Sequence, residues 1–266
     1  TWTIAFRRLL TRPILVGLVE HALRNPGTQP RVAALMTCGG ADSVELALKY
    51  VTQVPSSREF LTLVVEHMED AAPVLRGALG SDDPDRVIAA AHLLMMTCSM
   101  DVIGPLRALL RRKEPEVRAG AVTALGTCRD GVVLETLREA IRDPAPEVRI
   151  AAARSWAARE EHGRIMALLG ALRREKNFLV RRAIVEILAP LPAREATRTL
   201  VREALDSRTL WRPWGRPSRD CVVIVEALAT AARGGSQLAA EALGEVAVHG
   251  RGEVRRAARL CYPSTS

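Results

Sequence analysis

The apolar residues of this chain recur with the period of an α-helix. Val117, Ala121, Ala124 and Leu125 follow one another at intervals of four, three and one residues, which places them on one face of a helix. The preceding stretch, "VIGPLRALLRRK" at 102–113, is also amphipathic, and a short turn with Pro and Glu separates the two. This region therefore predicts two helices joined by a turn.

The same arrangement repeats along the sequence at intervals of about 30 residues. Corresponding valines lie near the start of the second helix of each copy, and the clearest are Val87, Val117, Val148 and Val180. Val254 marks a further copy after a longer interval, which leaves room for one extended unit. Pro-Glu-Val-Arg begins this helix in two copies, and Pro suits the first turn because the N–H that it lacks would be unpaired there. Each copy therefore predicts a helix pair.

The helix pairs predict an all-α fold, an α-solenoid of about eight pairs in a single repeat domain that covers residues 1–266. Only 3% of the residues are aromatic, so we expect a core of Ala, Leu, Val and Ile. Trp156 shares the register of Leu125 in its copy and is expected in that core. The approximate units are 13–38, 41–68, 70–99, 101–128, 130–160, 162–189, 192–233 and 235–262.

The turn and helix start "DPAPEVRIAA" at 143–152 resembles a HEAT repeat, in particular the short bacterial HEAT-like type of the PBS-lyase group. The resemblance is clear over residues 82–189 and weaker over 235–262, and it rests on the period alone over 13–70. It implies a superhelix of helix pairs. It also implies that an acidic residue and an arginine six positions later form hydrogen bonds along the stack.

This resemblance singles out six residues as an expected structural ladder. Asp143 and Arg149 match the family's pair, and Glu175 and Arg181 are a conservative variant. Arg118 and Arg255 keep the arginine, but the acid six residues earlier is replaced by Arg112 and by His249. The expected ladder residues are Asp143, Arg149, Glu175, Arg181, Arg118 and Arg255.

The chain is basic, with a formal net charge of +8. Arginine accounts for most of this charge, because Lys49, Lys113 and Lys176 are the only lysines among 38 basic residues. A basic excess fits either an ordinary solvated surface or an acidic partner. A protein with an acidic surface is the partner that we expect, and nucleic acid stays open as an alternative.

No motif of a catalytic, metal-binding or cofactor-binding site is present in the sequence. The histidines lack the spacing of metal ligands, no glycine-rich phosphate loop occurs, and the five cysteines contain no C-x-x-C pair. Thr-Cys recurs at 37–38, 97–98 and 127–128, where it fits the end of a repeated helix. We therefore expect no enzyme activity, no cofactor and no metal. Unpaired cysteines and the lack of a long apolar run predict a cytoplasmic chain, or a cytoplasm-facing part of a larger protein, without a transmembrane segment.

The seventh unit is longer than the others because of "DSRTLWRPWGRPSRD" at 206–220. Insertions in repeat proteins often lie on the binding face, and Trp and Arg are frequent in interface hot spots. Two interpretations stay open: the segment contacts a partner, or its tryptophans fill a gap where the stack changes angle. The candidate partner-binding residues are Arg208, Trp211, Arg212, Trp214, Arg216 and Arg219.

The combined pattern predicts a non-catalytic scaffold or adaptor that binds proteins on a curved repeat surface. The first alternative is nucleic-acid binding through arginine-rich surface, including a role in DNA repair, because alkylpurine DNA glycosylases have HEAT-like repeats. The second is an accessory subunit of a chromophore-lyase-type enzyme, since bilin lyases share the short repeat. No catalytic residue of either group can be matched to a position of this sequence.

Overall fold

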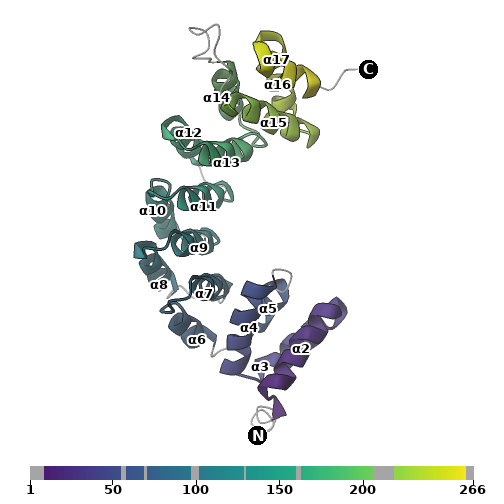
Figure 1. Cartoon of the computed structure of the whole chain (residues 1–266), viewed down its shortest axis with the longest axis vertical. Helices are drawn as coiled ribbons and strands as arrows, with labels where there is room; N and C mark the ends of the chain where they lie inside the picture. Colours follow the sequence, from purple (N-terminus) through teal and green to yellow (C-terminus); the bar gives the residue numbers. More distant parts are fainter. Residues whose placement is uncertain are drawn as a thin grey trace. The chain divides into compact units, whose positions relative to one another are not determined.

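The computed structural model describes residues 9–54, 58–68, 71–96, 102–128, 130–159, 163–205 and 219–261. Within these ranges the chain forms sixteen α-helices, two short 3-10 helices, η1 (Pro26–Thr28) and η4 (Leu109–Arg111), and no strand. The predicted all-α class with repeated helix pairs is confirmed (Figure 1). The pairs are α2 (Arg12–Arg24) and α3 (Gln29–Thr37), α4 (Ala41–Gln53) and α5 (Arg58–Glu66), α6 (Ala71–Ala78) and α7 (Pro84–Met96), α8 (Ile103–Ala108) and α9 (Pro115–Gly126), α10 (Gly131–Ala140) and α11 (Pro146–Ala157), α12 (Arg164–Arg174) and α13 (Phe178–Leu188), α14 (Arg194–Leu205) and α15 (Arg219–Arg233), and α16 (Gln237–His249) and α17 (Gly252–Cys261).

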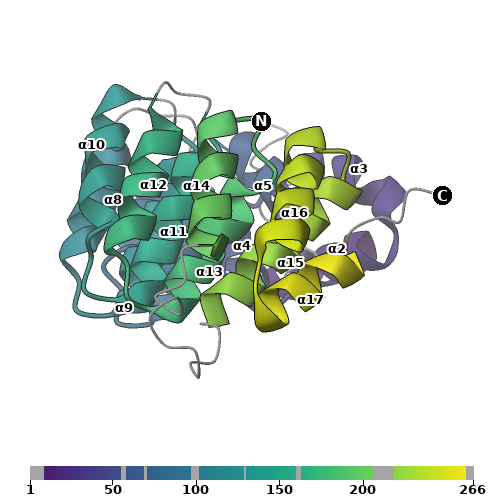
Figure 2. The ribbon, with the colours of Figure 1, turned by 90° about the horizontal axis from the view of Figure 1, so that it is seen from above.

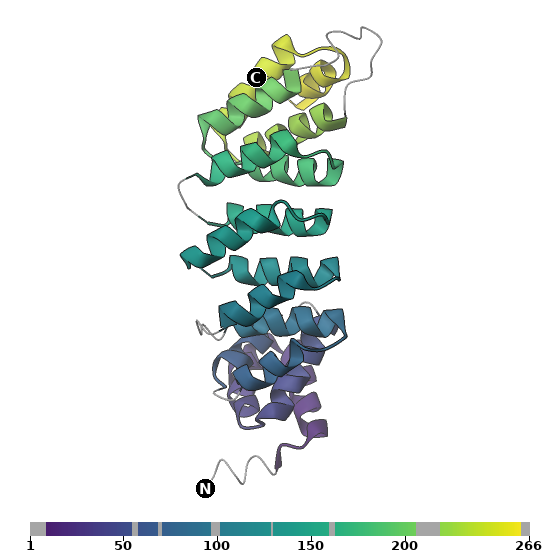
Figure 3. The ribbon, with the colours of Figure 1, turned by 90° about the vertical axis from the view of Figure 1, so that its left-hand side faces the viewer.

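The chain divides into two compact units, Thr1–Thr136 and Leu137–Ser266. In the first unit, α3, α5, α7 and α9 pack one against the next, and α2, α4 and α6 form a neighbouring series. In the second unit, α11, α13, α15 and α17 form one layer and α12, α14 and α16 form the other (Figure 2). Consecutive pairs follow one another along each unit, as in an α-solenoid (Figure 3). The single domain over residues 1–266 stays a prediction.

The starts of the second helices follow from local chemistry. Pro84, Pro115 and Pro146 are the first residues of α7, α9 and α11, where the missing N–H costs no hydrogen bond. α13 begins differently, because the side chain of Asn177 accepts hydrogen bonds from the N–H groups of the second and third residues after it. These starts fix the register in which the apolar stripe of each helix faces the core.

The core is built mainly from aliphatic side chains and alanine. Small residues let helices approach closely: a Cβ at Gly120 in α9 would lie 2.8 Å from Cγ1 of Ile88 in α7. Trp156 is 4% exposed, as its register predicted, and the guanidinium carbon of Arg138 lies 5.9 Å from the centre of its ring. This spacing is within the range of a cation–π contact.

The recurring Thr-Cys pairs coincide with helix ends where they can be described. Cys38 follows the last residue of α3, Cys128 follows α9 closely, and both are free thiols. Cys98 lies outside the described residues. Over the described parts of the chain, no helix is both long and apolar enough to cross a membrane.

Candidate partner-binding site

Arginines near the start of several second helices bind backbone carbonyls of the preceding turn. In α9, Nη1 of Arg118 donates to the carbonyl oxygens of the residues six and five positions before it, each at 2.9 Å. Arg149 in α11 forms the equivalent bonds at 2.8 and 2.9 Å. Arg255 in α17 donates from Nε to the carbonyl of Gly250 at 2.6 Å. Since these turn carbonyls have no helical partner, the guanidinium groups fix the geometry of the turns.

Arg149 also joins its helix pair to the next one. Its Nε and Nη2 donate to the two carboxylate oxygens of Glu175 at 2.7 and 3.1 Å, and the two side chains are only 16% and 10% exposed. Burial alone raises the pKa of Glu175. This effect is outweighed by the hydrogen bond and the charge of Arg149 and by hydrogen bonds from the N–H groups of Asn177 and Lys176. The pKa of Glu175 is therefore lowered.

Two further ion pairs also connect consecutive helix pairs. Nη2 of Arg181 in α13 lies 3.4 Å from Oε2 of Glu203 in α14. In the first unit, Nη2 of Arg86 in α7 is 2.8 Å from both carboxylate oxygens of Glu45 in α4. The sixth ladder residue, Asp143, accepts the N–H of Ala145 at 2.8 Å and so shapes the turn before α11.

The loop candidates from the sequence cannot be placed in this way. Arg208, Trp211, Arg212, Trp214 and Arg216 lie outside the described residues. Arg219 begins α15, but its side chain lies outside the described part. The partner-binding role of these six residues stays a prediction.

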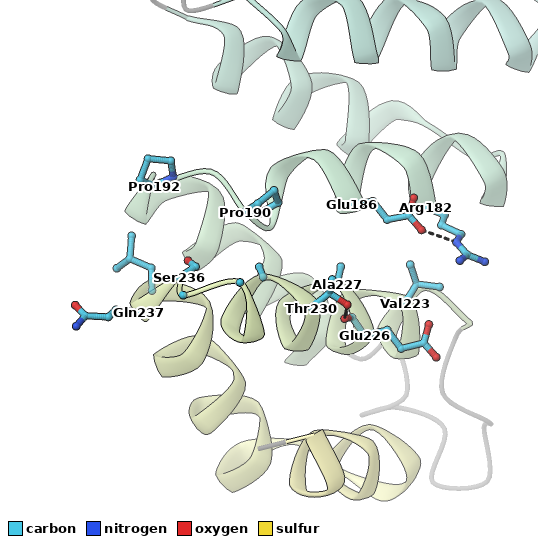
Figure 4. A pocket seen from close by; sticks show the side chains of 14 residues that line it. Arg182, Glu186, Pro190, Pro192, Val223, Glu226, Ala227, Thr230, Ser236 and Gln237 are labelled. Atoms are coloured by element: carbon cyan, nitrogen blue, oxygen red, sulfur yellow. Dashed lines mark hydrogen bonds and ion pairs between the residues drawn. The ribbon is translucent and has the colours of Figure 1, made fainter. Parts of the chain in front are cut away.

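A groove in the second unit is the candidate site that the described residues form. It lies between α13 and α15 and has a volume of about 900 Å³ (Figure 4). We call it the α13–α15 groove. Apolar contributions come from Val223, Ala227 and Ala231 of α15 and from Pro190 and Pro192 in the turn after α13. The turn between α15 and α16 closes one end with Gly234, Gly235 and Ser236.

This closing turn depends on a glycine. Gly235 has a φ of 94°, in the left-handed region that side chains with a Cβ rarely adopt. The next residue, Ser236, caps α16 by accepting the N–H of Ala239 at 3.3 Å. The sharp turn therefore brings the first residues of α16 to the end of the groove.

The opposite end of the groove is charged. Nε of Arg182 donates to Oε1 of Glu186 at 2.7 Å, one turn along α13, and Glu226 of α15 lies in the same part of the groove (Figure 4). The pKa of Arg182 is raised, mainly by the hydrogen bond and the charge of Glu186. Burial lowers this pKa, and the charge of Glu226 raises it further. The carboxylate of Glu226 forms no hydrogen bond or ion pair with the residues described. One guanidinium and two carboxylates give this end a formal charge of −1.

The sequence contained a signal for one wall of this groove. Arg182 and Glu186 are four residues apart, the spacing of neighbours on one helix face, and both are exposed. The other wall comes from α15, whose Glu226 is 40 residues further along the chain than Glu186. Only the packing of α13 against α15 brings the two walls together.

Comparisons with known proteins agree with these repeated helix pairs. A sequence model of HEAT repeats matches residues 103–189. This part of the chain consists of HEAT repeats. The matched range contains Arg118, Arg149 and Arg181 of the ladder and one wall of the α13–α15 groove. No curated protein matches the sequence.

Two solved structures are similar to the chain over nearly its whole length. The YibA protein of Escherichia coli is 15% identical, with a TM-score of 0.47, and the similarity covers 94% of this chain and 97% of YibA. Human deoxyhypusine hydroxylase, solved in complex with glycerol, is 18% identical, with a TM-score of 0.36 and 96% of each chain covered.

The second of these structures corrects one expectation. We expected no enzyme activity because the sequence contains no catalytic motif. Human deoxyhypusine hydroxylase is an enzyme and is among the chains that this protein resembles. That expectation was wrong: a helical repeat fold can carry a catalytic site as well as a binding surface, so a missing motif does not exclude an enzyme.

Proposed function

We propose that the protein is a scaffold that binds a protein partner, and that the α13–α15 groove receives a segment of that partner. HEAT repeats commonly mediate protein interactions, and the repeats include one wall of this groove. The cysteine pattern further supports a role in the cytoplasm. The net charge of +8 favours a partner that is acidic over much of its surface.

The observation that carries this proposal is the combination, in an open groove, of apolar surface and one carboxylate that forms no hydrogen bond or ion pair with the residues described. Val223, Ala227 and the two prolines offer surface for small apolar side chains, and Glu226 offers a partner for a cation. An extended peptide with a Lys or Arg flanked by apolar residues matches this lining. The two carboxylates beside one arginine make this groove a poor site for phosphates, which supports protein over nucleic acid as its occupant.

Site-specific photocrosslinking tests the proposal. A benzophenone side chain placed at Thr230, inside the groove, should crosslink one protein in the source cells. The same group at Met166, which is 52% exposed on α12 of the other layer, is the control and should crosslink that protein far less.

A charge reversal sharpens this test. Glu226→Lys should abolish most of the crosslinking from position 230, because the cation of the partner would meet a lysine. Glu147→Lys, at an exposed position at the start of α11, is the matched control and should leave it unchanged. Equal crosslinking of many proteins from positions 230 and 166, or insensitivity to Glu226→Lys, would contradict the proposal.

A further inference from the structure

A second groove lies in the other layer of the same unit. It runs between α14 and α16, which pack against each other, and has a volume of about 600 Å³. We call it the α14–α16 groove. Residues of α14 form one wall and residues of α16 the other, and the lining contains none of the described side chains of the α11–α13–α15–α17 layer.

The α14 wall is a row of three arginines. Arg194, Arg198 and Arg202 are exposed and follow one another at intervals of four residues, so their positions along the helix axis are about 6 Å apart. None of them forms a hydrogen bond or ion pair with its side chain among the residues described. Their positive charges are therefore available to a ligand, unlike those of the ladder arginines, which bind turn carbonyls and carboxylates.

The α16 wall carries the opposite charge. Glu241 and Glu245 are exposed, lie one turn apart on α16 and line the groove. Within the described part of the chain, neither carboxylate is within 4.0 Å of a basic nitrogen. The groove therefore has a positive edge and a negative edge that do not neutralise each other directly.

The floor between the two edges is largely apolar and has the same four-residue spacing. Thr197, Val201 and Leu205 contribute from α14, and Leu238 and Ala242 contribute from α16. Val201 is 7% exposed and Ala242 is 3% exposed, so both already belong to the packed surface between the helices. A row of contacts at intervals of four residues matches the face of an α-helix.

We propose that the α14–α16 groove binds an amphipathic helix of a partner protein, with acidic residues along the edge that faces α14 and basic residues along the edge that faces α16. Apolar residues at intervals of three and four would lie on the floor, as in other helix-in-groove complexes. The proposal builds on the protein-binding role proposed above but uses a different groove, which adjoins the first at Leu238. With both grooves occupied, the second unit would hold two partner segments, one on each of its two helix layers.

The negative edge decides between protein and nucleic acid as the occupant. A polyanion would gain from the three arginines but would be repelled by Glu241 and Glu245 on the opposite edge of the groove. A helix with charges of both signs satisfies both edges. The two occupants therefore respond in opposite directions to removal of the negative edge.

The probe for this proposal is a designed, fluorescently labelled peptide of about 15 residues, long enough to populate a helix. Glutamates occupy one edge, leucines the centre and lysines the other edge. A scrambled peptide of the same composition is the peptide control. Exchanging the two edges would not be a control, because such a helix could bind in the reverse direction. Fluorescence anisotropy measures the dissociation constant for the full chain.

Four variants assign the binding to this groove. Arg198→Glu and Glu241→Lys should each weaken the peptide about fivefold, because one attraction becomes a repulsion at an exposed position. Arg154→Glu, at an exposed arginine of α11, should leave the affinity unchanged. Glu226→Lys, in the α13–α15 groove, should also have no effect, which separates this proposal from the first. Circular dichroism checks that each variant keeps the helical content of the parent.

The outcomes are decisive in either direction. Saturable binding of the designed peptide, weakened by both groove variants and by neither control, supports the proposal. No saturable binding up to about 1 mM, equal binding of the scrambled peptide, or no effect of Arg198→Glu overturns it. Tighter binding of a single-stranded oligonucleotide after Glu241→Lys, combined with no binding of the peptide, would assign the arginine row to nucleic acid instead.

Discussion

Replacing Glu175 by glutamine should destabilise the second unit by about 2 kcal/mol. Removal of one partner of a buried ion pair costs about 3–5 kcal/mol, because the other charge stays buried without its counter-charge. Arg149 and Glu175 are 16% and 10% exposed, which is close to that case. Two features lower the cost: Arg149 keeps its bonds to two turn carbonyls, and glutamine can still accept an N–H from Asn177.

Urea denaturation followed by circular dichroism measures this loss. The matched comparison is Glu186→Gln, which also removes a carboxylate from an arginine at 2.7 Å, but in a pair that is about half exposed. That variant should leave the midpoint unchanged within error. Arg149→Met, alone and combined with Glu175→Gln, completes a double-mutant cycle for the buried pair.

The dependence on pH provides a second readout. Because the folded chain lowers the pKa of Glu175 below its ordinary value of 4.5, the stabilisation by this carboxylate is present above pH 4.5. It is lost as the pH falls through the lowered value, so the parent chain and Glu175→Gln should converge in stability in acid. A coupling energy of zero between Arg149 and Glu175, or a stability difference that does not change with pH, would refute the reasoning.

Three further predictions concern the fold. Asn177→Ala should cost about 1 kcal/mol in urea denaturation, because the N–H groups at the start of α13 lose their acceptor. Trp156→Ala should cost about 3–5 kcal/mol and Trp156→Phe clearly less, since the alanine leaves the larger cavity, and thermal unfolding compares the two. Gly17→Ala should stabilise the chain by about 0.5–1 kcal/mol, because a Cβ in the middle of α2 meets nothing within 4 Å. Gly120→Ala should not give that gain, because its Cβ would lie 2.8 Å from Ile88, and equal gains would contradict the account of this contact.

The helix pairs could be predicted because each one is encoded locally. Val117 and Val148 fall at equivalent positions after a Pro-Glu start, and the structure buries both, at 0% and 1% exposure. Short-range spacing was sufficient, since a helical stripe needs only neighbours three or four residues away. The register of Trp156 followed from the same rule.

The partners of the ladder arginines were harder to predict. The family resemblance pointed to an acid six residues before each arginine, and Arg149 does contact position 143, but through the backbone carbonyl. Its carboxylate partner in the described contacts, Glu175, comes 26 residues later. Such a contact depends on how far one turn lies from the next, which a single sequence does not specify.

The two grooves also depend on contacts between helix pairs that a single sequence does not specify. The spacing of Arg194, Arg198 and Arg202 is visible in the sequence. They form one wall of a groove only because α16, which carries Glu241 and Glu245, packs opposite them. Sequence reasoning instead favoured the segment at 206–220, where Trp and Arg gather within 15 residues. Local composition reveals such a cluster, whereas a groove between helices emerges only from packing.

The central claim is that this protein binds another protein through its repeat surface. A native pull-down from the source cells, with and without nuclease, tests it most directly when the parent chain and Glu226→Lys are compared side by side and the captured material is identified by mass spectrometry. The account predicts one protein that is retained after nuclease treatment and lost with Glu226→Lys. Capture of nucleic acid, with all co-purifying proteins released by nuclease, would contradict it.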